Sequence, residues 1–356
     1  MWLDKWWFYK DRAQLTAPQR GRRPLSRTLC QSVCTLSILL SSVGVWAQQA
    51  VKPTRVLRMA HTLDQQHVVH KSMEFLASRI DELSHGQMQL RIYPGGQLGS
   101  ERELIELLQI GSLAMTKVSA APLEGFSPNM KLFSVPYVFR DESHLWQVLE
   151  GPIGQQMLAD LDKVRLKGLG YFDAGARSFY TTQQRIDAPS DLQGLKFRVP
   201  NSQTAVEMVQ TLGGAATPVD WGELYTALQQ GVVDGAENNP PSFYSSRHYE
   251  ISKYYVLDEH TYVPDVILMS KHVWDSLSAD EQQIVSKAFA DAVVFERAAW
   301  HKATADALAA VQKAGVTVII PDKAQFMAAV QPLHQQLQGT PIGDLMAQIK
   351  ALGGQQ

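Results

Sequence analysis

Cysteine is nearly absent from this sequence, and the two that occur lie close to its beginning. They are Cys30 and Cys34, in a chain of 356 residues. Residues 35–356 therefore cannot form a disulfide framework or a thiolate metal site. The folded part of the chain has to be stabilised by its hydrophobic core.

Long apolar runs are also scarce, and the longest weakly polar run covers residues 29–46. Seven Lys and Arg residues precede it, against Asp4 and Asp11. A basic segment followed by an apolar segment is typical of an export signal. We predict that residues 1–47 are a signal peptide, cleaved before Gln48. The alternative is a retained membrane anchor, which the Ser, Thr, Cys and Gln residues within the run disfavour.

The remaining chain has an excess of acidic residues. Without residues 1–47 it carries 26 basic and 33 acidic residues, a net charge of −7. Such a surface attracts neither nucleic acid nor an anionic membrane, so an anionic ligand would have to be bound by local arginines. The 309 residues are more than one hydrophobic core usually contains, which predicts two lobes.

Strand and helix patterns alternate along the chain, which predicts an α/β fold with a parallel or mixed sheet. Ser100 is expected to cap a helix in which Glu103 reaches back, and Gly111 to end it. Residues 173–177 are expected to be a turn where the chain crosses between lobes. The other predicted elements are strands at 56–60, 88–93, 167–172, 266–270 and 316–320 and helices at 67–83 and 279–314.

Residues 194–243 carry the features that point most directly to a binding site. Leu195, Phe197 and Val199 alternate with Lys196 and Arg198, which predicts a strand with one apolar face. A buried charge is costly unless it is paired, so an arginine at a strand end is expected to face a crevice suited to an anion. The alternative is that Arg198 pairs with a structural acid.

The same stretch predicts the other walls of that crevice. Asp220 and Glu223 have the spacing of a capping box, and Gly231 is expected to end the helix that follows. Residues 232–233 are expected to be a short inner strand. Residues 234–241 have turn chemistry and place two amides where this strand ends.

We expect neither a metal nor a cofactor. His67 and His70 have a helical spacing that can bind metal, but a third ligand is missing. His61, His67 and Lys71 instead surround the start of one helix, where anions are favoured; the alternative for Lys71 is a solvated helix residue. The glycines of residues 95–99 lack the dinucleotide-binding spacing, and no nucleophile elbow, zinc signature or pair of catalytic carboxylates indicates an exported enzyme.

Several motifs occur in order along the chain and together resemble one family. The sequence resembles the solute-binding proteins of tripartite ATP-independent periplasmic (TRAP) transporters, the DctP family, over residues 55–350. The motifs are PGGQLGSERELIELLQIGSLAM, DAGARSFYTT, DLQGLKFRVPN, ATPVDWGELYTALQQGVVDGAENN and HYEISKYY.

The resemblance implies a two-lobed periplasmic binding protein fold, with a hinge and a central ligand cleft. Such a protein binds an organic acid and delivers it to a small and a large integral membrane permease subunit, without an ATPase. An extracytoplasmic sensor subunit would use the same binding physics. We place lobe I at residues 52–174 and 264–303, and lobe II at residues 175–263 and 304–356.

The resemblance also implies roles for individual residues. Arg198 is expected to pair with the ligand carboxylate, with Arg177 and Asn238 assisting. The position of His61 often contacts ligand in the family, the alternative being a hydrogen-bonded loop histidine. Asn239 would donate to hydroxyls or only form the turn.

Other positions bear on which acid is bound. Glu101 matches an acidic position of sialic-acid binders but could serve the helix dipole instead. Ser119 stands where those binders have an acid, which argues against sialic acid. Trp221 could lie against a sugar ring or pack in the core. The ENNPPSF turn, with the HYE run after it, resembles the acid-sugar-binding branch of the family, which implies a hexuronate such as glucuronate or galacturonate. The alternative is a C4-dicarboxylate or keto acid, for which Lys71 would supply a second cation.

Overall fold

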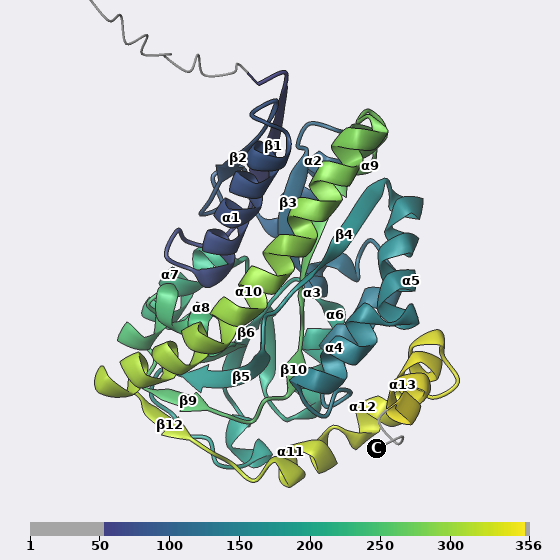
Figure 1. Ribbon diagram of the computed structural model, residues 1–356. Coiled ribbons are helices and arrows are strands. Elements are labelled where there is room, and N and C mark those ends of the chain that lie inside the picture. The colour runs from purple at the N-terminus through teal and green to yellow at the C-terminus, as the bar shows by residue number, and fades with distance from the viewer. Residues whose placement is uncertain (1–52, 353–356) are drawn as a thin grey trace, which may run out of the picture. The chain divides into compact units, whose positions relative to one another are not determined.

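The computed structural model describes residues 53–352 (Figure 1). It contains two β-sheets surrounded by helices, as the alternating pattern predicts. The first sheet has the order β2-β1-β3-β11-β4; β1 is parallel to β2 and β3, whereas β11 is antiparallel to β3 and β4. Its strands are β1 (Arg55–Ala60), β2 (Met88–Tyr93), β3 (Met115–Ser119), β4 (Leu166–Phe172) and β11 (Asp265–Ser270).

The second sheet has the order β12-β9-β5-β8-β6-β7, and β10 pairs with β5. Neighbours β8, β6 and β7 are parallel to one another, and β5 is antiparallel to β8 and β9. Its strands are β5 (Ala176–Thr181), β6 (Lys196–Val199), β7 (Ala215–Pro218), β8 (Gly235–Asn238), β9 (Tyr254–Val256), β10 (Thr261–Tyr262) and β12 (Thr317–Ile319).

The helices include one of 35 residues, α10, and many short ones. None of the described helices is long and apolar enough to cross a membrane. The α-helices are α1 (Val68–Leu83), α2 (Glu101–Gln109), α3 (Ala120–Leu123), α4 (Glu142–Glu150), α5 (Pro152–Asp160), α6 (Gln203–Thr211), α7 (Leu224–Gln229), α8 (Pro240–Ser245), α9 (Lys271–Asp275), α10 (Ala279–Lys313), α11 (Lys323–Ala329), α12 (Gln331–Gln336) and α13 (Pro341–Leu352). The 3₁₀ helices are η1 (Pro128–Ser134), η2 (Leu161–Val164), η3 (Pro189–Leu192), η4 (Trp221–Glu223) and η5 (His248–Glu250).

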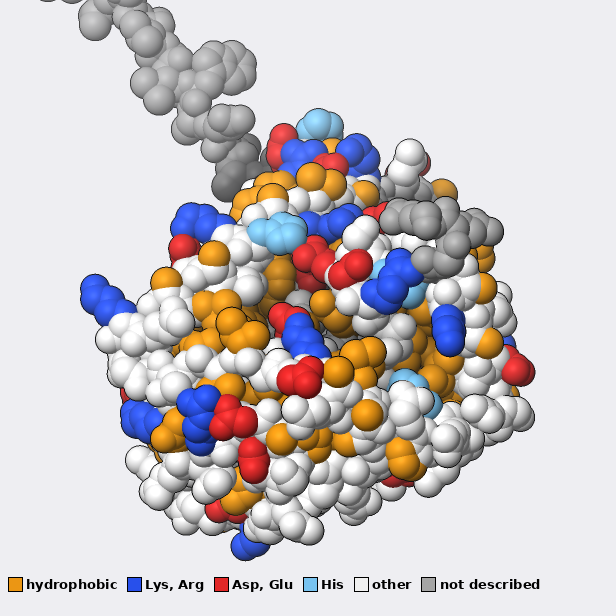
Figure 2. Space-filling view, turned by 90° about the horizontal axis from the view of Figure 1, so that it is seen from below, with side chains coloured by type: hydrophobic (Ala, Val, Ile, Leu, Met, Phe, Trp, Pro, Cys, Tyr) orange, Lys and Arg blue, Asp and Glu red, His pale blue; other side chains and the backbone are white. Residues whose placement is uncertain are grey.

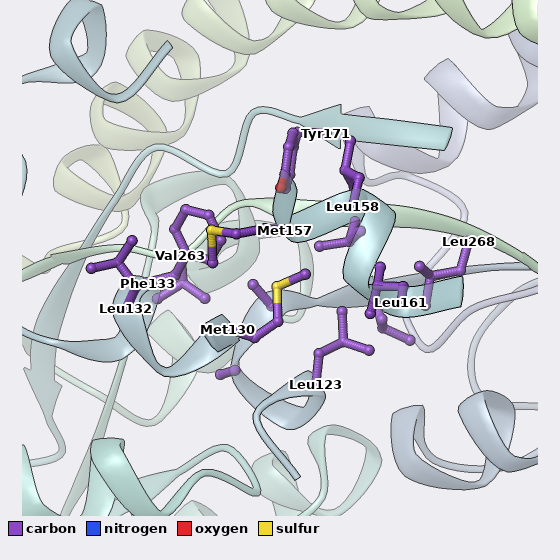
Figure 3. Close-up of a cluster of buried hydrophobic side chains, with 14 of the residues drawn as sticks. Leu123, Met130, Leu132, Phe133, Met157, Leu158, Leu161, Tyr171, Val263 and Leu268 are labelled. Carbon is purple, nitrogen blue, oxygen red and sulfur yellow. The ribbon is translucent and has the colours of Figure 1, made fainter. Parts of the chain in front are cut away.

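The first sheet is buried on both faces, and strand β11 shows how. Val266 and Leu268 belong to one apolar cluster, whereas Ile267 and Met269 belong to another, because successive side chains of a strand point to opposite faces. Figure 3 shows the first cluster, where side chains of α5, η1 and β4 meet. Helices α1 and α10, which pack on each other, contribute to the second.

The second sheet has its own pair of apolar clusters. Phe197 and Val199 of β6 pack with α6, α11 and α12 on one side. Tyr180 and Ala236 pack with α7 and α8 on the other. The alternation predicted for β6 is therefore confirmed, with Arg198 on the face opposite Phe197 and Val199.

The chain passes between the two sheets at defined places. Residues 173–175 connect β4 of the first sheet to β5 of the second. The turn predicted at 173–177 is therefore shorter than expected, because Ala176 and Arg177 already belong to β5. Residues 263–264 lead back from β10 to β11, and α10 contacts both α1 and α8. Helix α13 packs through Ile342 and Ile349 into a cluster of the first sheet. The lobe boundaries given above remain a prediction.

Two local predictions in residues 220–241 are wrong. The strand is not at residues 232–233 but at β8, because the amides of Val232 and Val233 donate to the Ala227 carbonyl and hold these residues in the turn that follows α7. Asp220 makes no side-chain cap, and a 3₁₀ turn begins there instead of an α-helix. The Ser100 prediction is confirmed, since Glu103 accepts from the Ser100 amide at 2.8 Å.

Candidate functional site

A cavity lies where strand ends of the two sheets meet. The first sheet contributes residues of β3 and β11, and the second contributes residues of β5, β6 and β8. The lining residues are Thr62, Leu63, Glu101, Lys117, Ser119, Ala174, Arg177, Arg198, Pro200, Trp221, Asn238, Asn239, Ser242, Val263 and Asp265.

Arg198 is buried in this cavity without an acidic partner in the described part of the chain. It is 4% exposed, and its Nε donates to the Val219 carbonyl at 2.7 Å. Its guanidinium carbon lies 5.5 Å from the centre of the Trp221 ring. Burial lowers the pKa of Arg198 below its ordinary value, which reflects the cost of an unneutralised charge. The alternative, that Arg198 pairs with a structural acid, is therefore wrong.

Arg177 is the arginine that pairs with a structural acid. Its Nη2 donates to Glu237 Oε1 at 2.7 Å, its Nε donates to Oε2, and its Nη1 donates to Asn238 Oδ1 at 3.1 Å. Burial opposes the ionisation of Glu237, but the Arg177 charge prevails and lowers the pKa of Glu237 to about 2. Arg177 is thus already neutralised, and its remaining effect is to orient the Asn238 amide.

His260 extends this pair into a network that the sequence analysis did not identify. Its Nδ1 lies 2.7 Å from Asp258 Oδ2, and its Nε2 lies 3.4 Å from Glu237 Oε2. Burial lowers the pKa of His260, but the two carboxylates outweigh it and raise the value to about 9. The sequence contained one indication of a role for Glu237, because this residue stands beside the predicted ligand contact Asn238. The segment was interpreted as a turn, so Glu237 was not singled out.

Lys117 is a further buried cation that the sequence analysis did not identify. Its Nζ lies 2.8 Å from Asp265 Oδ1 and 3.5 Å from Glu101 Oε1. Burial lowers the pKa of Lys117, but these two acids outweigh it and raise the pKa above the ordinary value. Glu101 Oε1 also accepts from the Ser119 amide at 2.9 Å. Lys117 and Asp265 lie on strands without a local motif, so only the fold could reveal them.

Trp221 and Asn239 have structural roles as well as a place in the lining. Asn239 Oδ1 accepts from the Ser242 amide at 2.8 Å and caps α8, so the amide does form the local turn. The Trp221 ring lies 5.1 Å from that of His248 and packs on two apolar clusters.

His61 and Lys71 do not line the cavity. His61 is fully buried, with its Nε2 2.9 Å from His70 Nδ1, and its chain neighbours Thr62 and Leu63 line the cavity instead. Burial lowers the pKa of His61 to about 3, so this side chain is neutral. Lys71 is exposed and lines a separate hollow beside α8 and α10.

His67, the other histidine of the predicted His67–His70 pair, also has a partner within the protein. His67 Nε2 lies 3.0 Å from Ser242 Oγ, which joins the start of α1 to α8. No group of three potential metal ligands is found among residues 53–352.

Comparison with known proteins assigns the chain to a family. The model of the bacterial extracellular solute-binding proteins, family 7 (DctP), matches residues 59–340. The chain belongs to this family. The resemblance inferred from the motifs is confirmed, and with it the two-lobed fold with a hinge and a central cleft.

Solved structures of TRAP solute-binding proteins match nearly over their whole length. One from Xanthobacter autotrophicus Py2 has bound β-D-galacturonate, with 40% identity, a TM-score of 0.80, and coverage of 83% of this chain and 99% of that one. One from Bradyrhizobium sp. BTAi1, with galacturonate, has 40% identity, a TM-score of 0.81 and coverage of 83% and 100%. One from Pseudomonas putida F1, with D-glucuronate, has 34% identity, a TM-score of 0.80 and coverage of 83% and 97%.

This DctP-family chain is therefore a solute-binding protein of a TRAP transporter. Its family is periplasmic, and it takes an organic acid as ligand and membrane permease subunits as partners. The predicted signal peptide of residues 1–47 lies outside the described residues.

Proposed function

We propose that this protein captures a hexuronate, such as glucuronate or galacturonate, in the periplasm by an Arg198–carboxylate clamp. The observation that carries the proposal is a buried arginine with no acidic partner among the described residues, in a cavity whose other cations are paired. A guanidinium offers two parallel donors to a carboxylate, so it fixes orientation as well as charge. The bound carboxylate would supply the missing counter-charge.

Seven of the nine expected site residues support this role because they line the cavity. They are Arg198, Arg177, Asn238, Trp221, Asn239, Glu101 and Ser119. Since Asn238 Oδ1 already accepts from Arg177, its amide Nδ2 is the group turned to ligand hydroxyls. His61 and Lys71 are left out of the proposed contact set, because neither lines the cavity.

The proposed mechanism is binding and delivery without chemistry. The open form admits the acid, and contacts from both lobes then stabilise the closed form by their differential binding energy. The crossings at residues 173–175 and 263–264 and the long helix α10 are the proposed hinge. Delivery is to a small and a large membrane subunit driven by an ion gradient. We infer that the protein is no enzyme.

The test is a thermal-shift screen of residues 48–356, refolded to remove carried ligand, against hexuronates, aldonates, dicarboxylates and keto acids. A ligand at 100 times its Kd stabilises the folded state by about 2.7 kcal/mol, a shift of several degrees. Calorimetry on Arg198→Ala then tests the clamp, with Arg185→Ala as control because Arg185 is exposed and pairs with Asp187.

Each outcome of this screen has a defined meaning. A uronate hit that Arg198→Ala abolishes supports the proposal. A dicarboxylate or keto-acid hit would keep the clamp and replace the hexuronate by the alternative ligand class. Retained uronate affinity in Arg198→Ala would contradict the clamp, and turnover of a bound acid would contradict the absence of chemistry.

A further inference from the structure

The cavity has a second charged wall, which belongs to the first sheet. It consists of Glu101 at the start of α2, Lys117 of β3 and Asp265 at the start of β11, and we call it the acidic wall. Lys117 is 4% exposed and Asp265 is 5% exposed. The wall combines one cation with two carboxylates, so its sign is opposite to that of Arg198.

Two acceptor atoms of the acidic wall are free for a ligand. Lys117 Nζ binds Asp265 Oδ1 and Glu101 Oε1, and the latter also accepts from the Ser119 amide. These contacts use Asp265 Oδ1 and Glu101 Oε1, which leaves Asp265 Oδ2 and Glu101 Oε2 for a ligand in the cavity that both residues line. Burial raises the pKa of Asp265, and the Lys117 charge acts against this shift. An ionised carboxylate only accepts hydrogen bonds, so such atoms bind hydroxyl groups and repel anions.

We propose that the acidic wall recognises the hydroxylated, uncharged end of the ligand and rejects acids that carry a second carboxylate there. The inference rests on the proposed function and deepens it, since it selects monocarboxylic polyhydroxy acids over dicarboxylic ones. Lys117 does not act as the second cation that a dicarboxylate needs, because its charge is exceeded by its two partners. It holds the carboxylates in place instead.

This discrimination has to come from buried groups. On the face shown in Figure 2, basic and acidic side chains are interspersed and do not gather by sign. The net charge of −7 without residues 1–47 disfavours anions in general but does not distinguish one end of a ligand from the other. A like charge placed against a desolvated carboxylate, by contrast, strongly disfavours the wrong ligand.

The experiment compares pairs of ligands that differ at one end. Calorimetry measures Kd for glucuronate, gluconate and glucarate. Glucarate has a second carboxylate where glucuronate has its aldehyde group and where gluconate has its terminal CH₂OH group. The wild type should prefer the monocarboxylic acid by about 100-fold or more. In Glu101→Gln the glucarate affinity should rise, which reduces the preference to about 10-fold or less. Glu106→Gln is the control, because Glu106 lies on the same helix and pairs with exposed Arg102.

Asp265→Asn is the second variant, and it should reduce the preference in the same direction. It removes the nearest partner of Lys117 and could prevent folding, in which case Glu101→Gln alone decides. Equal binding of glucuronate and glucarate by the wild type, or an unchanged preference in Glu101→Gln, overturns the inference and leaves the proposed function standing. A wild type that binds only gluconate-type acids overturns the hexuronate assignment but retains the acidic wall. A wild type that binds only dicarboxylates overturns both.

Discussion

Arg177 and Glu237 form a buried ion pair between adjacent strands β5 and β8, with Nη2 and Oε1 separated by 2.7 Å. The two are 7% and 2% exposed. Because of this pair, the two arginines of the site have different roles. Arg177 has its charge neutralised within the protein and orients Asn238, whereas Arg198 remains the cation without an acidic partner among the described residues.

Removing the Glu237 charge should destabilise the protein. In Glu237→Gln, Arg177 stays buried without a counter-charge, which costs about 3–5 kcal/mol of unfolding free energy. Urea unfolding of the ligand-free protein measures the loss. Glu207→Gln is the control, since Glu207 lies on α6 and its side chain accepts from that of the exposed Gln203. A loss below about 1 kcal/mol, like that of a surface pair, would contradict the structural role of Glu237.

Removing the Arg198 charge should reduce ligand affinity without destabilising the ligand-free protein. Arg198→Met deletes a buried unpaired cation, so we expect the ligand-free protein to keep its stability or gain some. Affinity for the acid should fall by about 2–5 kcal/mol, roughly 30-fold to several thousand-fold. Arg198→Lys keeps the charge but loses the two parallel donors, so its affinity for the acid should lie between that of the wild type and that of Arg198→Met. Calorimetry and urea unfolding together separate the two effects; a large stability loss with unchanged affinity would reverse the assignment.

Trp221 should matter more for ring-shaped ligands than for extended ones. Trp221→Ala removes an aromatic face from the cavity and the partner of the Arg198 guanidinium. We expect a loss of about 0.5–1.5 kcal/mol that is larger for a uronate than for succinate. Trp221→Phe keeps an aromatic face and should recover part of the affinity. Equal losses for both ligands would show that the indole acts only through core packing or through Arg198.

Glu296 should make stability depend on pH. This residue of α10 is fully buried; its Oε2 accepts from the Asp173 amide at 2.9 Å, and its Oε1 has no partner in the described chain. Burial raises the pKa of Glu296 well above its ordinary value, and Asp173 and Asp265 add to the shift. Arg297 and the Asp173 amide act against it.

The sign of this dependence follows from linkage. A carboxyl whose folded pKa exceeds its unfolded value of about 4.3 contributes stability that is present below that value and is lost as the pH rises towards the folded pKa. Glu296→Gln cannot ionise, so its unfolding free energy should increase relative to that of the wild type as the pH rises above about 4.3. The slope is at most about 1.4 kcal/mol per pH unit. Asp306→Asn, an exposed site on α10, should show no such trend. If the unfolding free energies of the wild type and of Glu296→Gln change in parallel with pH, the expectation is wrong.

Local signals predicted much of the secondary structure. Strand β2 and the start of α2 occur where the sequence placed them, because alternation and Ser–Glu capping act within a few residues. The strand at 232–233 was misplaced because Glu237 and Asn238 are polar. A polar segment forms a buried central strand only when its side chains find partners, and those partners lie on other strands.

The sequence by itself determined the family, the α/β class and the arginine that ends a strand beside the cavity. Only the tertiary structure decided which charges pair. Arg177 meets Glu237, 60 residues away, and Lys117 meets Asp265 on a strand that returns from the second sheet. Such pairs depend on the order and direction of strands, which are set by burial of the whole chain. Periodicity and capping register only neighbouring residues, so they could name Arg198 but could not show that it lacks an acidic partner in the described chain.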